Sequence, residues 1–149
     1  SEDERQKRMA KGMSYALRLD MSRASTISGP LFWQDRQHGR VKAQPDRFGD
    51  VVLARKETPT SYHLAVTVDD HIQGVTLVTR GADLFDATHV HRLLQTLLGY
   101  ETPEYQHHRL LTDSAGRRLA KRDGDITVRA LRAANYTPAE VHAMTGFDG

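Results

Sequence analysis

The fold is decided by SYHLAVTVDDHIQGVTLVTRGADLFDATHVHRLLQTLLGY, residues 61–100. The nearly continuous apolar run YHLAVTVDD (62–70) predicts a strand buried on both faces, and TLVTRG (76–81) predicts a shorter strand that ends at a glycine. Residues 87–98 carry a valine and leucines at helical spacing, and Gly99 stands where a helix C-cap belongs. Strands that alternate with a helix in this way predict an α/β fold with at least one crossover connection.

The segments after residue 50 extend this rhythm. DVVLARK (50–56) and YQHHRLL (105–111) predict further strands. TVRALRAANY (127–136) and TPAEVHAMTG (137–146) predict two short helices, and the second opens with the capping-box residues Thr137, Pro138 and Glu140.

Residues 1–49 lack that rhythm and predict a separate subdomain. A helix is expected over the first dozen residues, a strand over 14–21, and a turn-rich loop over 22–30. Short strands with turns at His38-Gly39 and Pro45-Asp46 are expected to follow. We therefore expect three parts: 1–49 as part of an inserted subdomain, 50–126 as the main α/β part, and 127–149 as a C-terminal helical pair.

Composition narrows the class of protein. The chain has 149 residues, of which 38% are hydrophobic and 27% charged, and no run is long enough to span a membrane. The charged N-terminal dozen is unlike a signal peptide. Without a cysteine the chain can form no disulfide or cysteine-zinc site, which fits a cytoplasmic protein.

A basic segment near the C-terminus is the first candidate for chemistry. GRRLAKRDGD, residues 116–125, places four cations around the apolar anchors Leu119 and Ala120. Such a loop can hold an ammonium group against nucleotide phosphates, which need cations where negative charge develops. Taken alone, the same segment also fits an ordinary solvated turn.

Three segments in the right order resemble the class I aminoacyl-tRNA synthetases of the glutamyl group. RLAKR (118–122) resembles their KMSKS loop, residues 58–88 their central substrate-binding stretch, and residues 105–123 the strand that feeds the loop. The resemblance covers nearly the whole chain. It implies the C-terminal half of a Rossmann-like catalytic domain, together with part of an inserted acceptor-binding-type subdomain.

The resemblance also implies site residues. Tyr62 and Arg80 match the residues that bind substrate glutamate, and an arginine suits a carboxylate because it donates two parallel hydrogen bonds. Without the resemblance, Tyr62 could equally pack in a core and Arg80 could pair with Asp83 or Asp86 on the surface. The KMSKS-like loop (Arg118, Leu119, Ala120, Lys121 and Arg122) would bind ATP, with Lys121 in the catalytic role.

The branch of the family can be inferred too. The chain stops shortly after the KMSKS-like loop, as the glutamyl-queuosine tRNA(Asp) synthetase branch does, and RLDMSRAS (18–25) resembles that branch. This implies a parent enzyme that activates L-glutamate with ATP and Mg²⁺ and transfers it to the queuosine base of tRNA(Asp). Because no HIGH-like segment is present, we expect this chain to be inactive alone; a non-catalytic RNA-binding fragment and a truncated discriminating glutamyl-tRNA synthetase are the alternatives.

The histidines and paired aspartates predict no metal site. His89 and His91 are two apart on a predicted helix, and neighbours on a strand such as His107 and His108 point to opposite sides, so neither pair is a natural chelate. His107 could face the nucleotide. Asp69 and Asp70 are expected to close a turn. We expect no zinc in this chain.

Overall fold

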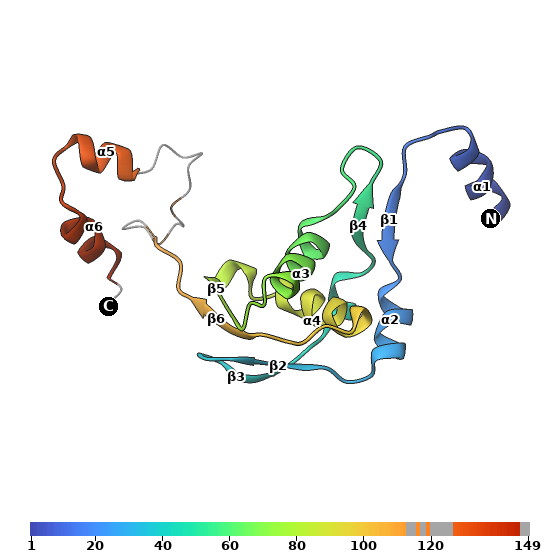
Figure 1. The fold of residues 1–149 in the computed structure, drawn as a ribbon, viewed down its shortest axis with the longest axis horizontal. Coiled ribbons are helices and arrows are strands. Elements are labelled where there is room, and N and C mark those ends of the chain that lie inside the picture. The colour runs from blue at the N-terminus through green and yellow to red at the C-terminus, as the bar shows by residue number, and fades with distance from the viewer. Residues whose placement is uncertain (113–115, 117–118, 120–126, 147–149) are drawn as a thin grey trace. The chain divides into compact units, whose positions relative to one another are not determined.

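The computed structural model describes residues 1–112, 116, 119 and 127–146. The chain divides into two compact units, residues 1–108 and 109–149. The first unit carries both sheets and four of the α-helices, and Figure 1 shows their arrangement. None of the helices in the described ranges is long and apolar enough to cross a membrane.

A four-stranded mixed sheet forms the centre of the first unit, with strand order β3-β2-β6-β5. β5 (Leu77–Gly81) and β6 (Glu104–His108) pair in parallel over five residue pairs, as a crossover connection requires. β2 (Phe32–Asp35) pairs in parallel with the other edge of β6 and forms an antiparallel hairpin with β3 (Gly39–Lys42). The α/β class and the crossover are therefore confirmed.

Helix α4 covers one face of this sheet (Figure 1). It runs over Ala87–Leu98 as expected, and Gly99 ends it with a positive φ of 71°, a conformation that glycine adopts without strain. The face beneath it is built by alternation: on β2 and β6 every second side chain is buried. Helix α3 (Tyr62–Ile72) packs beside α4, and the short 3-10 helix η2 (Ala82–Leu84) lies between β5 and α4.

The apolar core lies between α4 and this sheet. Val90, Leu93 and Leu94 of α4 pack with Trp33 of β2 and Tyr105 of β6. Trp33 is 2% exposed and meets His89 edge-on, with ring centroids 4.7 Å apart. Residues on both sides of position 50 thus share one core.

A second, two-stranded sheet lies at the N-terminal side of the unit. β1 (Ala16–Leu19) pairs antiparallel with β4 (Val51–Arg55), with an irregularity in register between Leu17 and Arg18. Helix α1 (Glu2–Ala10) precedes β1, and the 3-10 helix η1 (Pro45–Phe48) precedes β4. These elements agree with the expected helix, strands and turns.

Two predicted elements are wrong. Residues 62–70, expected to form a strand, form helix α3, because Ser61 caps the helix by accepting a hydrogen bond from the Leu64 backbone N–H. Asp69 and Asp70, expected in a turn, lie inside the same helix.

The second error concerns residues 22–30, expected to be a loop. They lie mostly in helix α2 (Met21–Ser28), where Asp20 accepts a hydrogen bond from the Arg23 backbone N–H at 2.9 Å. Met21 and Ala24 bury the apolar side of that helix in the core. Burial therefore outweighed the small polar residues that suggested a loop.

The described part of the second unit contains the two short helices expected there. α5 spans Val128–Ala133 and α6 spans Pro138–Thr145. α6 begins with the predicted capping box between Thr137 and Glu140. Within this unit Arg109 donates hydrogen bonds to the backbone carbonyls of Thr145 and Gly146 at 2.6 and 2.9 Å.

Candidate functional site

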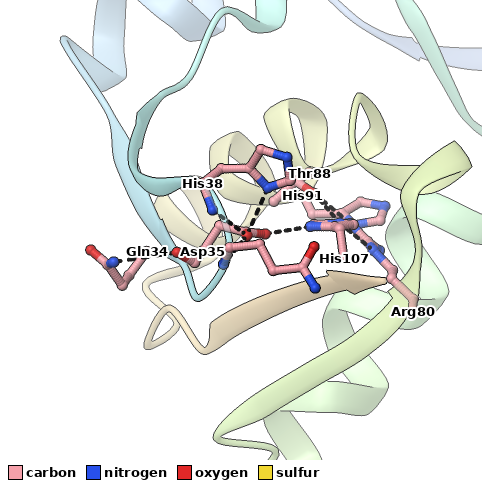
Figure 2. Close-up of polar contacts among 8 residues, drawn as sticks. Gln34, Asp35, His38, Arg80, Thr88, His91 and His107 are labelled. Atoms are coloured by element: carbon pink, nitrogen blue, oxygen red, sulfur yellow. Dashed lines mark hydrogen bonds and ion pairs between the residues drawn. The ribbon is translucent and has the colours of Figure 1, made fainter. Parts of the chain in front are cut away.

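Arg80 lies near the carboxyl end of β5 and is held by side chains from two other elements (Figure 2). Its Nε donates to Nε2 of His107 on β6 at 3.1 Å, and its Nη2 donates to the hydroxyl of Thr88 on α4 at 2.6 Å. Its Nη1 lies 3.2 Å from Nδ1 of His91, also on α4. These contacts fix the orientation of a half-buried guanidinium.

The contacts of Arg80 also fix the protonation of its histidine neighbours. A guanidinium can only donate hydrogen bonds, so Nε2 of His107 and Nδ1 of His91 must each present a lone pair. Burial first, and then the charge of Arg80, lower the pKa of His91 from its ordinary 6.5 to about 3. Burial likewise lowers the pKa of His107, although its bond to Asp35 acts the other way. Both rings are neutral near pH 7.

Asp35, at the end of β2, anchors the buried side of this network. Its Oδ2 lies 2.5 Å from Nδ1 of His107, and both side chains are 0% exposed. Its Oδ1 accepts the backbone N–H groups of Gln37 and His38 at 2.9 and 3.0 Å and contacts His38 Nδ1 at 2.9 Å. Burial raises the pKa of Asp35, but these hydrogen bonds outweigh it and lower the pKa to about 2.

Arg80 has hydrogen-bonding capacity left over. Its guanidinium carries five N–H groups. Three of them meet His107, His91 and Thr88, which leaves two. Within the described ranges, no ion pair includes Arg80, so the expected alternative of a surface pair with Asp83 or Asp86 is not formed. The site is a positioned cation with two N–H groups for an anion.

Tyr62 stands at the first residue of α3 and reaches the same network from the other side. Its ring meets the ring of His91 at 5.7 Å in an edge-on arrangement, and the side chain is 50% exposed. Nδ1 of the neighbouring His63 lies 3.0 Å from Nε2 of His91. The cavity of about 270 Å³ that Tyr62 lines does not include Arg80. Tyr62 and Arg80 are therefore linked through His91, which contacts both, rather than through one cavity.

The KMSKS-like loop falls mainly outside the described residues. Arg118, Ala120, Lys121 and Arg122 lie there, so their predicted roles rest on the motif alone. Leu119 is described: its backbone N–H donates to the Leu111 carbonyl at 3.0 Å, and its side chain is 37% exposed.

Sequence reasoning missed most of the residues that hold Arg80. Asp35 lies in none of the predicted motifs, and the expectation that His107 could face the nucleotide includes neither Asp35 nor Arg80. A signal was present in the alternation of the strands, since Asp35 shares a face with Trp33 and His107 shares a face with Tyr105. A buried aspartate and a buried histidine on the apolar faces of two strands each need a hydrogen-bond partner, and the simplest arrangement pairs them with each other.

Comparison with known proteins identifies the family. The family model described as "tRNA synthetases class I (E and Q), catalytic domain" matches residues 1–146. A glutamyl-Q tRNA(Asp) synthetase of Rhodobacter capsulatus is 47% identical over 135 residues, which cover 88% of this chain and 49% of the relative. One of Nocardia farcinica is 41% identical over 144 residues, covering 97% of this chain and 44% of the relative.

A solved structure extends the likeness to the fold. A glutamate tRNA ligase from Elizabethkingia meningosepticum, determined in complex with its amino acid, superimposes with a TM-score of 0.68 at 28% identity. The match covers 84% of this chain and 24% of that one. The chain thus spans half or less of the length of these relatives. With the family model matching nearly every residue, the chain belongs to the class I tRNA synthetases of the glutamate and glutamine (E and Q) group and carries part of their catalytic domain.

Proposed function

We propose that the full-length protein containing this segment activates L-glutamate with ATP and Mg²⁺ and transfers it to the queuosine base of tRNA(Asp). The observation that carries the proposal is the guanidinium of Arg80, which is fixed by three neighbours and keeps two N–H groups for an anion. A carboxylate accepts two such N–H groups in parallel.

The chemistry decides which carboxylate of glutamate Arg80 holds. In activation, an α-carboxylate oxygen attacks the α-phosphorus of ATP, the bond to the bridging oxygen breaks, and pyrophosphate leaves. An arginine on the attacking oxygens would withdraw the electron density that the attack needs. Arg80 is therefore assigned to the side-chain carboxylate, and Tyr62, which contacts His91 from the other side, is assigned to the same substrate.

The KMSKS-like loop supplies the nucleotide side of the proposal. Lys121 would stabilise charge on the leaving pyrophosphate, flanked by Arg118 and Arg122. Adenylation requires nucleotide, amino acid and loop to be positioned together, so the segment by itself is proposed to be inactive.

The identity of the acceptor is supported by the relatives. Three glutamyl-Q tRNA(Asp) synthetases match at 47%, 41% and 37% identity, whereas glutamate tRNA ligases of several organisms match at 30% to 34%. A discriminating glutamate tRNA ligase is the second candidate. Incubation with labelled glutamate separates the two, since the first would label queuosine-containing tRNA(Asp) and the second tRNA(Glu).

Glutamate-dependent pyrophosphate exchange by the full-length protein tests the site. Arg80→Ala should lower kcat/KM for glutamate at least about a hundredfold, because two charge-assisted hydrogen bonds are lost. Lys121→Ala should lower the rate of activation about a hundredfold or more, and Arg118→Ala should lower it less.

Arg92→Ala is the matched control for Arg80. Arg92 is also half-buried, but it contacts the Phe32 carbonyl and Thr96 rather than the site. Its loss should leave the KM for glutamate within about twofold, because it removes no hydrogen bond to glutamate. If Arg80→Ala and Arg92→Ala have equal effects on glutamate, the assignment of Arg80 is wrong.

A further inference from the structure

We infer that Asp35 is a positioning residue for substrate glutamate, acting through His107 on Arg80. Asp35 fixes the His107 tautomer whose lone pair faces Arg80, and this holds the two remaining N–H groups of Arg80 in one orientation. The inference deepens the proposed function and rests on it.

The chain of hydrogen bonds has only one consistent direction. Arg80 Nε can only donate to Nε2 of His107, so the proton of the neutral ring must be on Nδ1. Nδ1 faces Oδ2 of Asp35 at 2.5 Å, and a carboxylate is an acceptor. With the proton on Nε2 instead, two donors would face each other beside a half-buried charge, and the contact to Arg80 would be lost.

That contact matters for substrate because a guanidinium is planar and rigid. Holding Nε to His107, Nη1 to His91 and Nη2 to Thr88 fixes the plane and the direction of every remaining N–H bond (Figure 2). Thr88 Oγ1 also lies 3.3 Å from Nε2 of His107, so the same nitrogen serves two of the three supports. Loss of the lone pair on His107 therefore loosens the guanidinium as a whole.

The two oxygens of Asp35 perform separate tasks, which makes the inference testable. Oδ1 holds the turn after β2 through the backbone N–H groups of Gln37 and His38. Oδ2 contacts His107. In Asp35→Asn the remaining oxygen must stay with the two backbone donors, so the new amide NH₂ faces Nδ1 of His107. His107 must then accept there and carry its proton on Nε2, which is the wrong tautomer for Arg80. The corresponding aspartate-to-asparagine change in a serine protease triad acts through the histidine tautomer in the same way.

The experiment compares Asp35→Asn with His38→Ala in the full-length protein. Asp35→Asn should raise the KM for glutamate at least about tenfold and leave the KM for ATP within about twofold, because one charge-assisted support of Arg80 is lost. His38→Ala removes the side-chain contact to Oδ1 and the packing of the His38 ring on Phe85, but it leaves the contact of Oδ2 with His107. Both constants should therefore stay within about twofold. In ¹⁵N NMR spectra, His107 should change from the Nδ1–H to the Nε2–H tautomer in Asp35→Asn only.

A double-mutant cycle separates positioning from a loss of fold. In His107→Gln the amide oxygen can still accept from Arg80 Nε without help from Asp35. Adding Asp35→Asn to His107→Gln should therefore raise the KM for glutamate less than about twofold further, whereas a purely structural role of Asp35 would give the full tenfold loss again.

The outcomes are distinct. An unchanged His107 tautomer in Asp35→Asn, or a changed tautomer with an unchanged KM for glutamate, overturns the inference. If Asp35→Asn does not fold, His107→Gln is compared with His107→Asn, which offers no acceptor at the Nε2 position. An equal rise in the KM for glutamate in these two variants overturns the inference as well. Failure of the proposed function has a different signature, because Arg80→Ala itself would then leave glutamate activation intact.

Discussion

Helices α3 and α4 pack against each other, with Tyr62 and His63 of α3 beside His91 of α4, yet they are stabilised in different ways. Seven residues of α4 are buried, including Val90, Leu93 and Leu94. In α3 only Thr67 is buried, and its apolar side chains Leu64, Val66 and Val68 are half-buried around the helix. α4 depends on a one-sided apolar face, whereas α3 depends more on its cap. Two of the three side chains that hold Arg80, those of Thr88 and His91, lie on α4, the helix with more buried residues.

The largest expected effect tests this difference directly. Leu93→Ala should destabilise the chain by about 2–5 kcal/mol, because Leu93 is 0% exposed and its removal leaves a cavity. Leu64→Ala on α3 is the matched change, and it should cost less than about half as much, since its side chain is already partly exposed to solvent. Urea unfolding gives both free energies. Equal losses would show that α3 is as much a core helix as α4.

A second prediction concerns pH. Because burial and Arg80 lower the pKa of His91 from 6.5 to about 3, the folded chain binds fewer protons than the unfolded chain between these values. The contribution of His91 to stability is complete above pH 6.5 and falls as the pH decreases towards 3, by about 1.4 kcal/mol per pH unit at most.

The matched variants are His91→Asn on α4 and His63→Asn on α3. The pKa of His63 is also lowered by burial and by Arg80, but that ring is only half-buried. The free energy of unfolding should therefore decrease less steeply between pH 6.5 and 4 in His91→Asn than in His63→Asn. If the unfolding free energy of His91→Asn depends on pH as steeply as that of the wild type, His91 is not held neutral in the folded chain.

The smallest expected effect concerns the caps. Ser61→Ala should destabilise the chain by about 1 kcal/mol, since it removes the acceptor for the Leu64 backbone N–H. Asp86, at the N-cap of α4, makes no side-chain capping bond, so Asp86→Ala should cost at most about 0.5 kcal/mol. Thermal unfolding of the two variants checks the pair, and the reverse order would show that α3 does not depend on its cap.

The same contrast explains what the sequence could predict. The bounds of α4 follow from apolar residues at helical spacing and from Gly99, and both features survive in the structure. For α3 the β-branched residues Val66, Thr67 and Val68 gave a strand signal, and the contrary signal was one serine. Local pattern identifies a helix that has a polar and an apolar side, but not one that is apolar on most sides.

For the site, short motifs predicted the residues that would meet substrate but not those that support them. Tyr62 and Arg80 lie in a motif that spans a few dozen residues. Asp35 reaches His107 across 72 positions of the chain, and only the parallel pairing of β2 with β6 brings them together. Contacts of that range depend on strand order, which a single sequence leaves open.

Trp33 gives the molecule an optical property of its own. It is the single tryptophan of the chain, and its indole nitrogen, buried in the core, has no hydrogen-bond acceptor in the part of the chain that the structure describes. An indole shielded from water emits at the short-wavelength end of the tryptophan range, and a nearby protonated imidazole quenches it. His89 lies edge-on at 4.7 Å, and burial lowers its pKa. The tryptophan emission of the chain therefore comes from one residue at the contact of β2 with α4. Its intensity should stay high on acidification until His89 is protonated.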